Sequence, residues 1–329
     1  MIIQDTLDGL KLGAPASFQH LTMFPLLGRD AEGEDYLTLD EALASKTVHI
    51  TEVSEGGSVP ELRFVNEGDR QVLLMDGEEV VGAKQNRTLN ITILAAPHST
   101  LLLPVTCVEA GRWAHNSAEF QASPQAHYAA GRAQKQRSVS ESLFSGGNRV
   151  ADQGEVWADI DAKAMRMASQ SPTHAMAAMY LHHETHTEEF VHNLPFQEQQ
   201  RGAVFAIGGQ VIGLDLFDRA DTFRKLLSKI VRSYALDALE CSPQEQPSRD
   251  PSEIVADFLK SIAGAQMQSF AAVGIGEDVR LHSARLAGGA LVTGGRVVHL
   301  SVFAAEPATA SDSPESTLSR ASTRRRNRQ

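Results

Sequence analysis

The sequence predicts a mixed α+β fold: a β-rich body of repeated glycine-turn hairpins with several packed helices. Short segments with β-branched residues, or with alternating apolar and polar residues, fill the first hundred positions. In the second half of the chain, many apolar residues instead recur three and four positions apart. Glycine-containing turns separate apolar runs at three places. These patterns indicate strands first and helices later, with hairpins in both halves.

The predicted strands of the first half include residues 47–50, 72–75 and 89–94, and residues 101–108 continue the pattern as a buried strand. Residues 114–148 differ, because they contain much Gln, Ser, Ala and Gly and few large aliphatic side chains. This composition predicts a long, mobile loop or a loosely packed helix.

Helical spacing occurs across residues 154–192 and again over 220–239, where Asp218 is the candidate N-cap. Residues 242–252 carry three prolines and predict a linker, after which a further helix starts near Ile254. Because the apolar residues of 220–239 form one stripe, we expect this helix to cover a sheet.

The chain of 329 residues is long enough for one large domain or two ordinary ones. We expect residues 1–305 to form a single globular body, within which a subdivision near 114–150 stays open. Residues 306–329 combine Ser, Thr and Ala with a run of arginines and predict a disordered tail.

Three segments have the form of a hairpin with a glycine turn. Residues 208–217 align without gaps on 294–303, and residues 75–82 have the same form with Asp76-Gly77 at the turn. Glycine adopts the positive φ angles that tight hairpin turns need. Either an internal duplication or a shared β propensity explains the similarity. Polar groups on the strands that leave these turns can converge on one site.

Composition and charge exclude several classes of function. The 30 Lys and Arg residues against 41 Asp and Glu give a net charge of −11, so we expect no nucleic-acid partner. Cys107 and Cys241 lie far apart and form no CxxC motif, which argues against a disulfide framework or a zinc-cysteine site. The N-terminus lacks a secretory signal and no apolar run is long enough for a membrane anchor. We therefore expect a cytoplasmic protein; its cofactors and oligomeric state stay open.

The densest polar cluster follows a predicted strand, where β-branched and aromatic residues would be expected instead. Its side chains can bind a ligand: lysine and arginine a phosphate, glutamine and asparagine a sugar or base, and tryptophan a ring. The candidate ligand-binding residues are Lys84, Gln85, Asn86, Arg87, Arg112 and Trp113. The candidate catalytic residues, each a possible general base, are Glu79, Glu109 and Asp215. In the alternative interpretation these residues are internal scaffolding, with ion pairs such as Glu109 with Arg87.

A histidine-rich segment raises the question of a metal site. His182 and His186 lie one helical turn apart, the spacing at which two imidazoles can share a zinc ion. The HExxH order is absent, and a solvated helix face rich in His and Glu has the same composition. We therefore assign no metal site. Cys107 is a weaker candidate nucleophile, because a cysteine in a strand is usually a small buried apolar residue.

Three motifs together resemble a known family. They are Asp76-Gly77-Glu78-Glu79-x-x-Gly82-Ala83-Lys84-Gln85-Asn86-Arg87, Cys107-Val108-Glu109-x-Gly111-Arg112-Trp113 and Gly213-Leu214-Asp215-Leu216-Phe217-Asp218. The chain resembles the ADP-ribosylglycohydrolase and rhodanese-phosphatase-superfamily-associated domain proteins from about Phe18 to Phe303. The resemblance implies an association with enzymes that handle NAD-derived and ADP-ribosyl groups, and it supplies no established catalytic residues.

The leading hypothesis is a protein that binds or processes a phosphate-bearing small molecule related to NAD or ADP-ribose. The alternative is a non-catalytic protein-interaction or structural module whose hairpins offer an edge or groove to a partner. Whether the protein is an enzyme stays open at this point.

Overall fold

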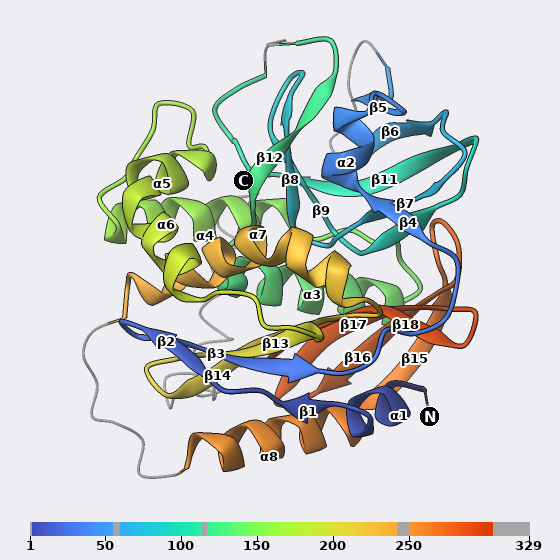
Figure 1. The fold of residues 1–329 in the computed structure, drawn as a ribbon. Helices are drawn as coiled ribbons and strands as arrows, with labels where there is room; N and C mark the ends of the chain where they lie inside the picture. Colours follow the sequence, from blue (N-terminus) through green and yellow to red (C-terminus); the bar gives the residue numbers. More distant parts are fainter. Residues whose placement is uncertain (1, 55–59, 114–116, 242–249, 305–329) are drawn as a thin grey trace.

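The largest sheet joins strands from both ends of the chain, and all its neighbouring strands are antiparallel (Figure 1). The computed structural model describes residues 2–54, 60–113, 117–241 and 250–304. In spatial order the strands of this sheet are β1 (Lys11–Leu12), β3 (Leu21–Leu27), β13 (Gln200–Ile207), β14 (Gln210–Phe217), β18 (Arg296–Ala304), β17 (Leu286–Thr293), β16 (Glu277–Ser283) and β15 (Gln266–Ala271), and β2 (Ala16–Phe18) also pairs with β3.

Two smaller sheets lie on the far side of a helical layer from the large sheet (Figure 1). One has the order β12 (Phe120–Ala126), β8 (Glu78–Gly82), β9 (Arg87–Leu89), β11 (Ser99–Cys107), β6 (Glu61–Asn66) and β5 (Val48–Glu52). The other has the order β10 (Ile93–Ala95), β7 (Gln71–Leu74) and β4 (Tyr36–Thr38), in which β4 runs parallel to β7. The described residues thus form a mixed α+β fold, as predicted.

Helices cover both faces of the large sheet (Figure 1). On its outer face lie α1 (Ile2–Asp8) and α8 (Pro251–Ala263). Between the sheets lie α3 (Ala129–Phe144) and α7 (Ala220–Ala238), beside α4 (Gln153–Arg166), α5 (Ala177–His182) and α6 (Glu184–Asn193), while α2 (Leu39–Ala44) lies next to the smaller sheets. No helix in the described parts of the chain is long and apolar enough to cross a membrane.

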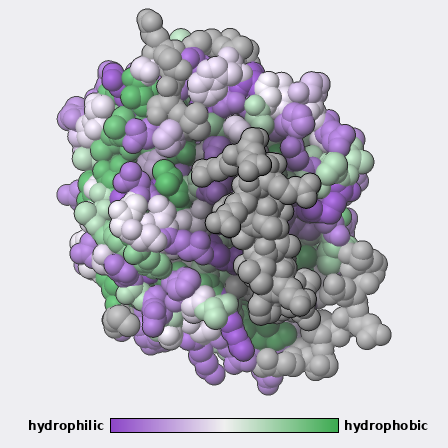
Figure 2. All heavy atoms as spheres, turned by 180° about the vertical axis from the view of Figure 1, so that it is seen from behind, coloured by the Kyte–Doolittle hydropathy of each residue, from purple (hydrophilic) through white to green (hydrophobic). Residues whose placement is uncertain are grey.

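The apolar stripe predicted over 220–239 is confirmed as α7, whose Phe223, Ile230 and Tyr234 pack in one core with the large sheet. Asp218 is not its N-cap: the N-cap residue is Arg219, which makes no side-chain cap bond. Asp218 directly follows β14 instead. Its amide donates to the carbonyl of Val298 in β18, and its buried carboxylate accepts the hydroxyl of Tyr36 in β4. On the reverse side of the molecule, hydrophilic and hydrophobic residues are interspersed over the coloured surface (Figure 2).

Two of the three predicted hairpins form. Gly208-Gly209 joins β13 to β14 and Gly294-Gly295 joins β17 to β18, with φ between 55° and 79° at these four glycines. The third prediction is wrong, because β7 pairs with β10 and β4 whereas β8 pairs with β9 and β12. The Asp76-Gly77 turn carries the chain from one sheet to another, and Gly77 has φ of 81°.

Of the prediction of a loop or loosely packed helix over 114–148, the helix forms, but the loose packing is wrong, and part of the segment is a strand. Strand β12 and helix α3 occupy the segment, and α3 buries Arg132, Lys135 and Gln136 between two sheets. A polar helix is stable there because its side chains find buried hydrogen-bond partners on both sides. The predicted tail, 306–329, and residues 242–249 of the predicted linker lie outside the described residues.

Candidate functional site

The polar run is a loop between β8 and β9 rather than a continuation of a strand, and it meets the segment that follows β11. Gln85 Nε2 donates to the carbonyl oxygen of Glu109 at 2.8 Å, and the amide of Asn86 donates to the Glu109 carboxylate at 3.2 Å. Gly111 approaches the backbone of Thr173 so closely that a Cβ atom would lie 2.9 Å from its Cα. The two motifs therefore form one structural unit against the segment before α5.

Arg112 ties this unit together. Its guanidinium forms an ion pair with Glu109 at 2.6 Å and donates to the carbonyl of Ala83 at 2.8 Å and to Asn86 Oδ1 at 3.0 Å. Three acceptors from two segments thus fix the position of the loop. The guanidinium is mostly committed to contacts within the protein.

Arg87 is fully buried, and the ion pair expected with Glu109 is not its contact. Its Nη1 donates to Gln85 Oε1 at 2.8 Å and to Cys107 Sγ at 2.5 Å, and its Nη2 lies 4.0 Å from a Glu52 carboxylate oxygen. Burial raises the pKa of the Cys107 thiol to about 11, so the thiol stays protonated at neutral pH and is a poor nucleophile.

Trp113 lies over both cations of the polar run. The centroid of its ring is 5.3 Å from Lys84 Nζ and 5.6 Å from Arg87 Cζ, and 48% of the residue is exposed. Cations against an aromatic face are stabilised by the ring quadrupole. Lys84 and Arg87 are thus held beneath the tryptophan rather than projecting into solvent.

A cleft of about 700 Å³ lies beside this unit, between β12, α5, α6 and α7. Of the sequence candidates, Asn86 and Glu109 line it, and the described lining contains none of the others. Gln125, Glu184, Glu188 and Arg232 add amide and charged side chains to its wall. Arg232 forms an ion pair with Glu188 at 2.6 Å, a residue whose side chain is 49% exposed. The cleft is within the usual range of ligand sites, about 300 to 1,000 Å³.

Glu79 lies directly behind the cleft wall and is fully buried. Its carboxylate accepts hydrogen bonds from Asn86 Nδ2 at 3.3 Å, from Gln125 Nε2 at 3.2 Å and from Ser123 Oγ at 2.8 Å. Burial raises the pKa of Glu79 from 4.5 to about 7, against the opposing effect of these three donors. The Glu79 carboxyl group therefore takes up and releases its proton near neutral pH. It is connected to the cleft by its hydrogen bonds with the carboxamides of Asn86 and Gln125, which line the cleft.

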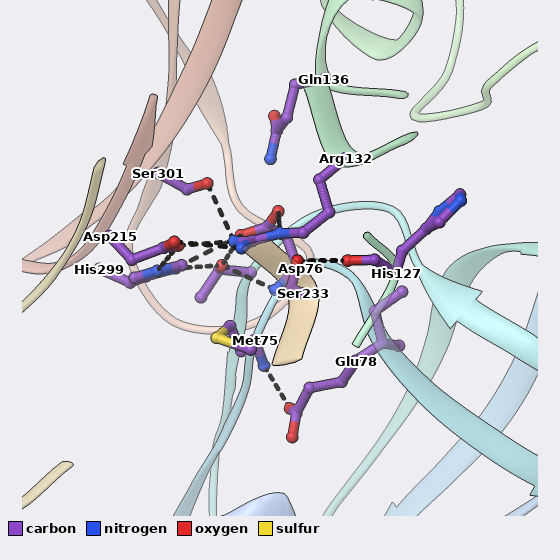
Figure 3. A network of polar contacts seen from close by, with 12 residues as sticks. Met75, Asp76, Glu78, His127, Arg132, Gln136, Asp215, Ser233, His299 and Ser301 are labelled. Atoms are coloured by element: carbon purple, nitrogen blue, oxygen red, sulfur yellow. Dashed lines mark hydrogen bonds and ion pairs between the residues drawn. The ribbon is translucent and has the colours of Figure 1, made fainter. Parts of the chain in front are cut away.

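Asp215 belongs to a different, fully buried polar network (Figure 3). Arg132 of α3 donates to both oxygens of Asp215, at 2.6 and 3.1 Å, to Asp76 at 3.3 Å and to Ser301 at 3.1 Å. The guanidinium lowers the pKa of both carboxyl groups, which stay ionised despite their burial. Asp215 does not line the cleft.

His299 brings a third potential metal ligand to this network. One ligand atom each from Asp76, Asp215 and His299 lie within 4.8 Å of one another, and no other such group occurs in the parts of the chain that the structure describes. The guanidinium of Arg132 already binds both carboxylates, so it supplies the positive charge that an ion would bring. We interpret the network as a structural link between the large sheet, α3 and the turn before β8. His182 and His186 are not part of it.

Two cleft residues, Gln125 and Arg232, carry no signal in the sequence that marks them as part of a site. Gln125 lies on β12, within the segment predicted as a loop or a loosely packed helix, and Arg232 is a partly buried residue of α7 among several charged residues of that helix. Their role depends on distant segments that meet only in the folded chain. Arg132 and Lys135 were missed for the same reason.

Comparison with known proteins identifies the family. A search of curated proteins and a search of solved structures found no match. The family model described as ARPP-1, ARG and Rhodanese-Phosphatase-superfamily-associated Protein domain, matches residues 9–303. This range includes all three motifs and both buried polar networks. The chain therefore belongs to the ARPP-1 family, a domain family of unknown function.

Proposed function

We propose that the chain binds a phosphate-bearing small molecule related to NAD or ADP-ribose in the cleft beside the polar loop. One observation carries the proposal: Asn86 and Glu109 of the two family-like motifs form a wall of a cleft of about 700 Å³, with a proton-exchanging carboxyl group directly behind it. Pockets with convergent polar groups and a perturbed titratable residue are favoured ligand sites.

The cleft offers distinct partners for the two parts of such a ligand. The carboxamides of Asn86 and Gln125 and the carboxylate of Glu109 match the hydroxyl groups of a ribose. Arg232 matches a phosphate, because its present partner, Glu188, is half exposed and can release it into solvent. In this proposal Lys84, Gln85, Arg87, Arg112 and Trp113 shape the wall. If the bound ligand is processed, Glu109 is the candidate base that lines the cleft.

Isothermal titration calorimetry with ADP-ribose, NAD and ribose 5-phosphate tests the proposal. We expect binding of at least one of them, and a loss of about tenfold or more in affinity in Arg232→Gln, since hydrogen bonds to charged groups contribute about 1.5–3 kcal/mol. Arg224→Gln is the matched control, because Arg224 is on the same helix and, among the described residues, pairs with Asp221 alone, outside the cleft lining.

Two results would contradict the proposal: no heat with any of the three compounds, or an equal loss of affinity in both arginine variants. The first result, together with a stable, well-folded wild-type protein, would favour the non-catalytic interaction module instead.

A further inference from the structure

The wall of the cleft contains two carboxamides that differ in their freedom to turn. Asn86 is fixed at both ends, because its Oδ1 accepts from Arg112 at 3.0 Å while its Nδ2 donates to Glu79. Gln125 is bonded through Nε2 to Glu79, and its Oε1 has no partner in the described chain. The buried side-chain atoms that lack a hydrogen bond in the described chain do not include this oxygen, so it is not buried. It is therefore exposed to the cleft that Gln125 lines.

The state of Glu79 decides which end of Gln125 faces the cleft. An ionised carboxylate is an acceptor only, and it holds the Gln125 amino group toward itself. A protonated carboxyl group must instead donate one hydrogen bond, because a buried donor without an acceptor costs about 1–3 kcal/mol. Since all three present partners donate to Glu79, protonation requires one of them to change its role.

Gln125 is the partner that can change at the lowest cost. Asn86 would lose its bond from Arg112 if it turned. Ser123 is buried, and Glu79 is the one acceptor for its hydroxyl among the described residues, so turning would leave that hydrogen unpaired. A 180° rotation of the Gln125 carboxamide gives Glu79 an acceptor and turns the amino group into the cleft, where water or a ligand accepts it.

We propose that the proton on Glu79 sets the ligand preference of the cleft by controlling the orientation of Gln125. With Glu79 ionised, Gln125 presents a carbonyl oxygen and favours a ligand hydroxyl. With Glu79 protonated, Gln125 presents an amino group and favours a phosphate oxygen, and binding of the anion then takes up one proton from solution. The ligand part of this inference rests on the proposed function; the carboxamide rotation does not.

Both states are accessible near neutral pH. In the described chain, no positively charged side chain forms a hydrogen bond with Glu79. Burial raises the pKa of Glu79 to about 7, and the negative charge of Glu109 acts in the same direction. Arg112 and Arg232 lie around the site but are bound to Glu109 and Glu188 respectively. Tyr180, on α5, donates to a backbone carbonyl, and burial raises its pKa well above the ordinary value, so it stays neutral.

The rotation can be tested without a ligand by following the side-chain amide ¹⁵N and ¹H resonances of glutamine from pH 5.5 to 8.5. We expect the Gln125 resonance, assigned by its absence in Gln125→Met, to titrate with a midpoint near 7 and to stop titrating in Glu79→Gln. The exposed Gln121 of the same strand serves as the internal control and should not move. A Gln125 resonance that is constant with pH, or that still titrates in Glu79→Gln, would overturn the proposal.

Binding of ADP-ribose, whose diphosphate does not titrate in this range, tests the ligand preference. We expect its affinity to fall by about tenfold between pH 7 and 8.5 in the wild type. Proton uptake, measured in buffers of different ionisation heats, should be about half a proton at pH 7 and about one proton at pH 8.5. In Glu79→Gln the affinity should not change with pH. If ADP-ribose does not bind at any pH, the proposed function fails while the resonance measurement still decides the rotation. Binding without proton uptake would refute the preference alone.

Discussion

Replacing Glu79 by glutamine should stabilise the protein at alkaline pH much more than at acidic pH. The folded-state pKa of Glu79 is raised from 4.5 to about 7. A raised carboxyl pKa means that folding favours the protonated form, so its contribution to stability is present below pH 4.5 and is lost as the pH rises through 7. Each pKa unit corresponds to about 1.4 kcal/mol, so ionised Glu79 lowers the free energy of unfolding by about 3 kcal/mol at pH 8.5 and by less than about 1 kcal/mol at pH 5.

Urea unfolding of the wild type and of Glu79→Gln at pH 5, 7 and 8.5 measures this difference. Any fixed cost of fitting the glutamine amide among Ser123, Asn86 and Gln125 is the same at each pH, so it cancels when the three values are compared. Glu198→Gln, at an exposed position, is the control and should give parallel curves. A stability difference between wild type and Glu79→Gln that is independent of pH would refute the reasoning.

Three further substitutions test the buried charges. Arg132→Met should lower the free energy of unfolding by about 3–5 kcal/mol, because Asp215 and its neighbouring carboxylate lose their cation; a chemical unfolding curve close to that of the wild type would contradict this. Arg87→Met should cost less than Arg132→Met in the same assay, since its nearest carboxylate oxygen, on Glu52, is 4.0 Å away; an equal or larger loss would argue for the scaffold interpretation of the polar loop. Lys135→Met should stabilise more at pH 6 than at pH 9, by about 3 kcal/mol. Burial lowers the lysine pKa from 10.5 to about 7, so the wild type loses stability as the pH falls from 10.5 through 7; a gain that is larger at pH 9 would show that the sign is wrong.

The sequence predicts local features well where one segment contains the whole signal. The stripe of α7 and the double-glycine turns at Gly208-Gly209 and Gly294-Gly295 depend on neighbouring residues, and they form as predicted. The Asp76-Gly77 turn has the same local signal, but whether it closes a hairpin depends on which strands β7 and β8 find as partners. Those partners lie elsewhere in the chain, and the two strands enter different sheets.

Helix α3 shows the same limit for a buried element. Its polar composition indicates exposure, yet Arg132 is bound to Asp76 and Asp215, which are 56 and 83 residues away in sequence. Hydrophobic periodicity gives no information about such long-range pairings. A buried helix with charged residues therefore has the same sequence pattern as a loosely packed, exposed helix. The polar loop was more accessible to sequence reasoning, because its contact with Glu109 joins two motifs that are both dense in polar residues.

Two buried groups, Glu79 and Lys135, make the stability of this fold depend on pH in opposite directions. The stability that protonated Glu79 contributes is lost as the pH rises from 4.5 through 7, and the stability that neutral Lys135 contributes is lost as the pH falls from 10.5 through 7. Both losses are therefore nearly complete at about pH 7. Lys135 donates to Thr88 and to the Leu89 carbonyl and does not line the cleft, whereas Glu79 supports the cleft wall. The double variant Glu79→Gln/Lys135→Met should therefore lose both pH-dependent contributions to stability. The pH dependence of ADP-ribose binding should disappear in Glu79→Gln and persist in Lys135→Met. Loss of the pH dependence in both variants would show that the two groups are coupled through the fold, and persistence in Glu79→Gln would show that Glu79 is not its source.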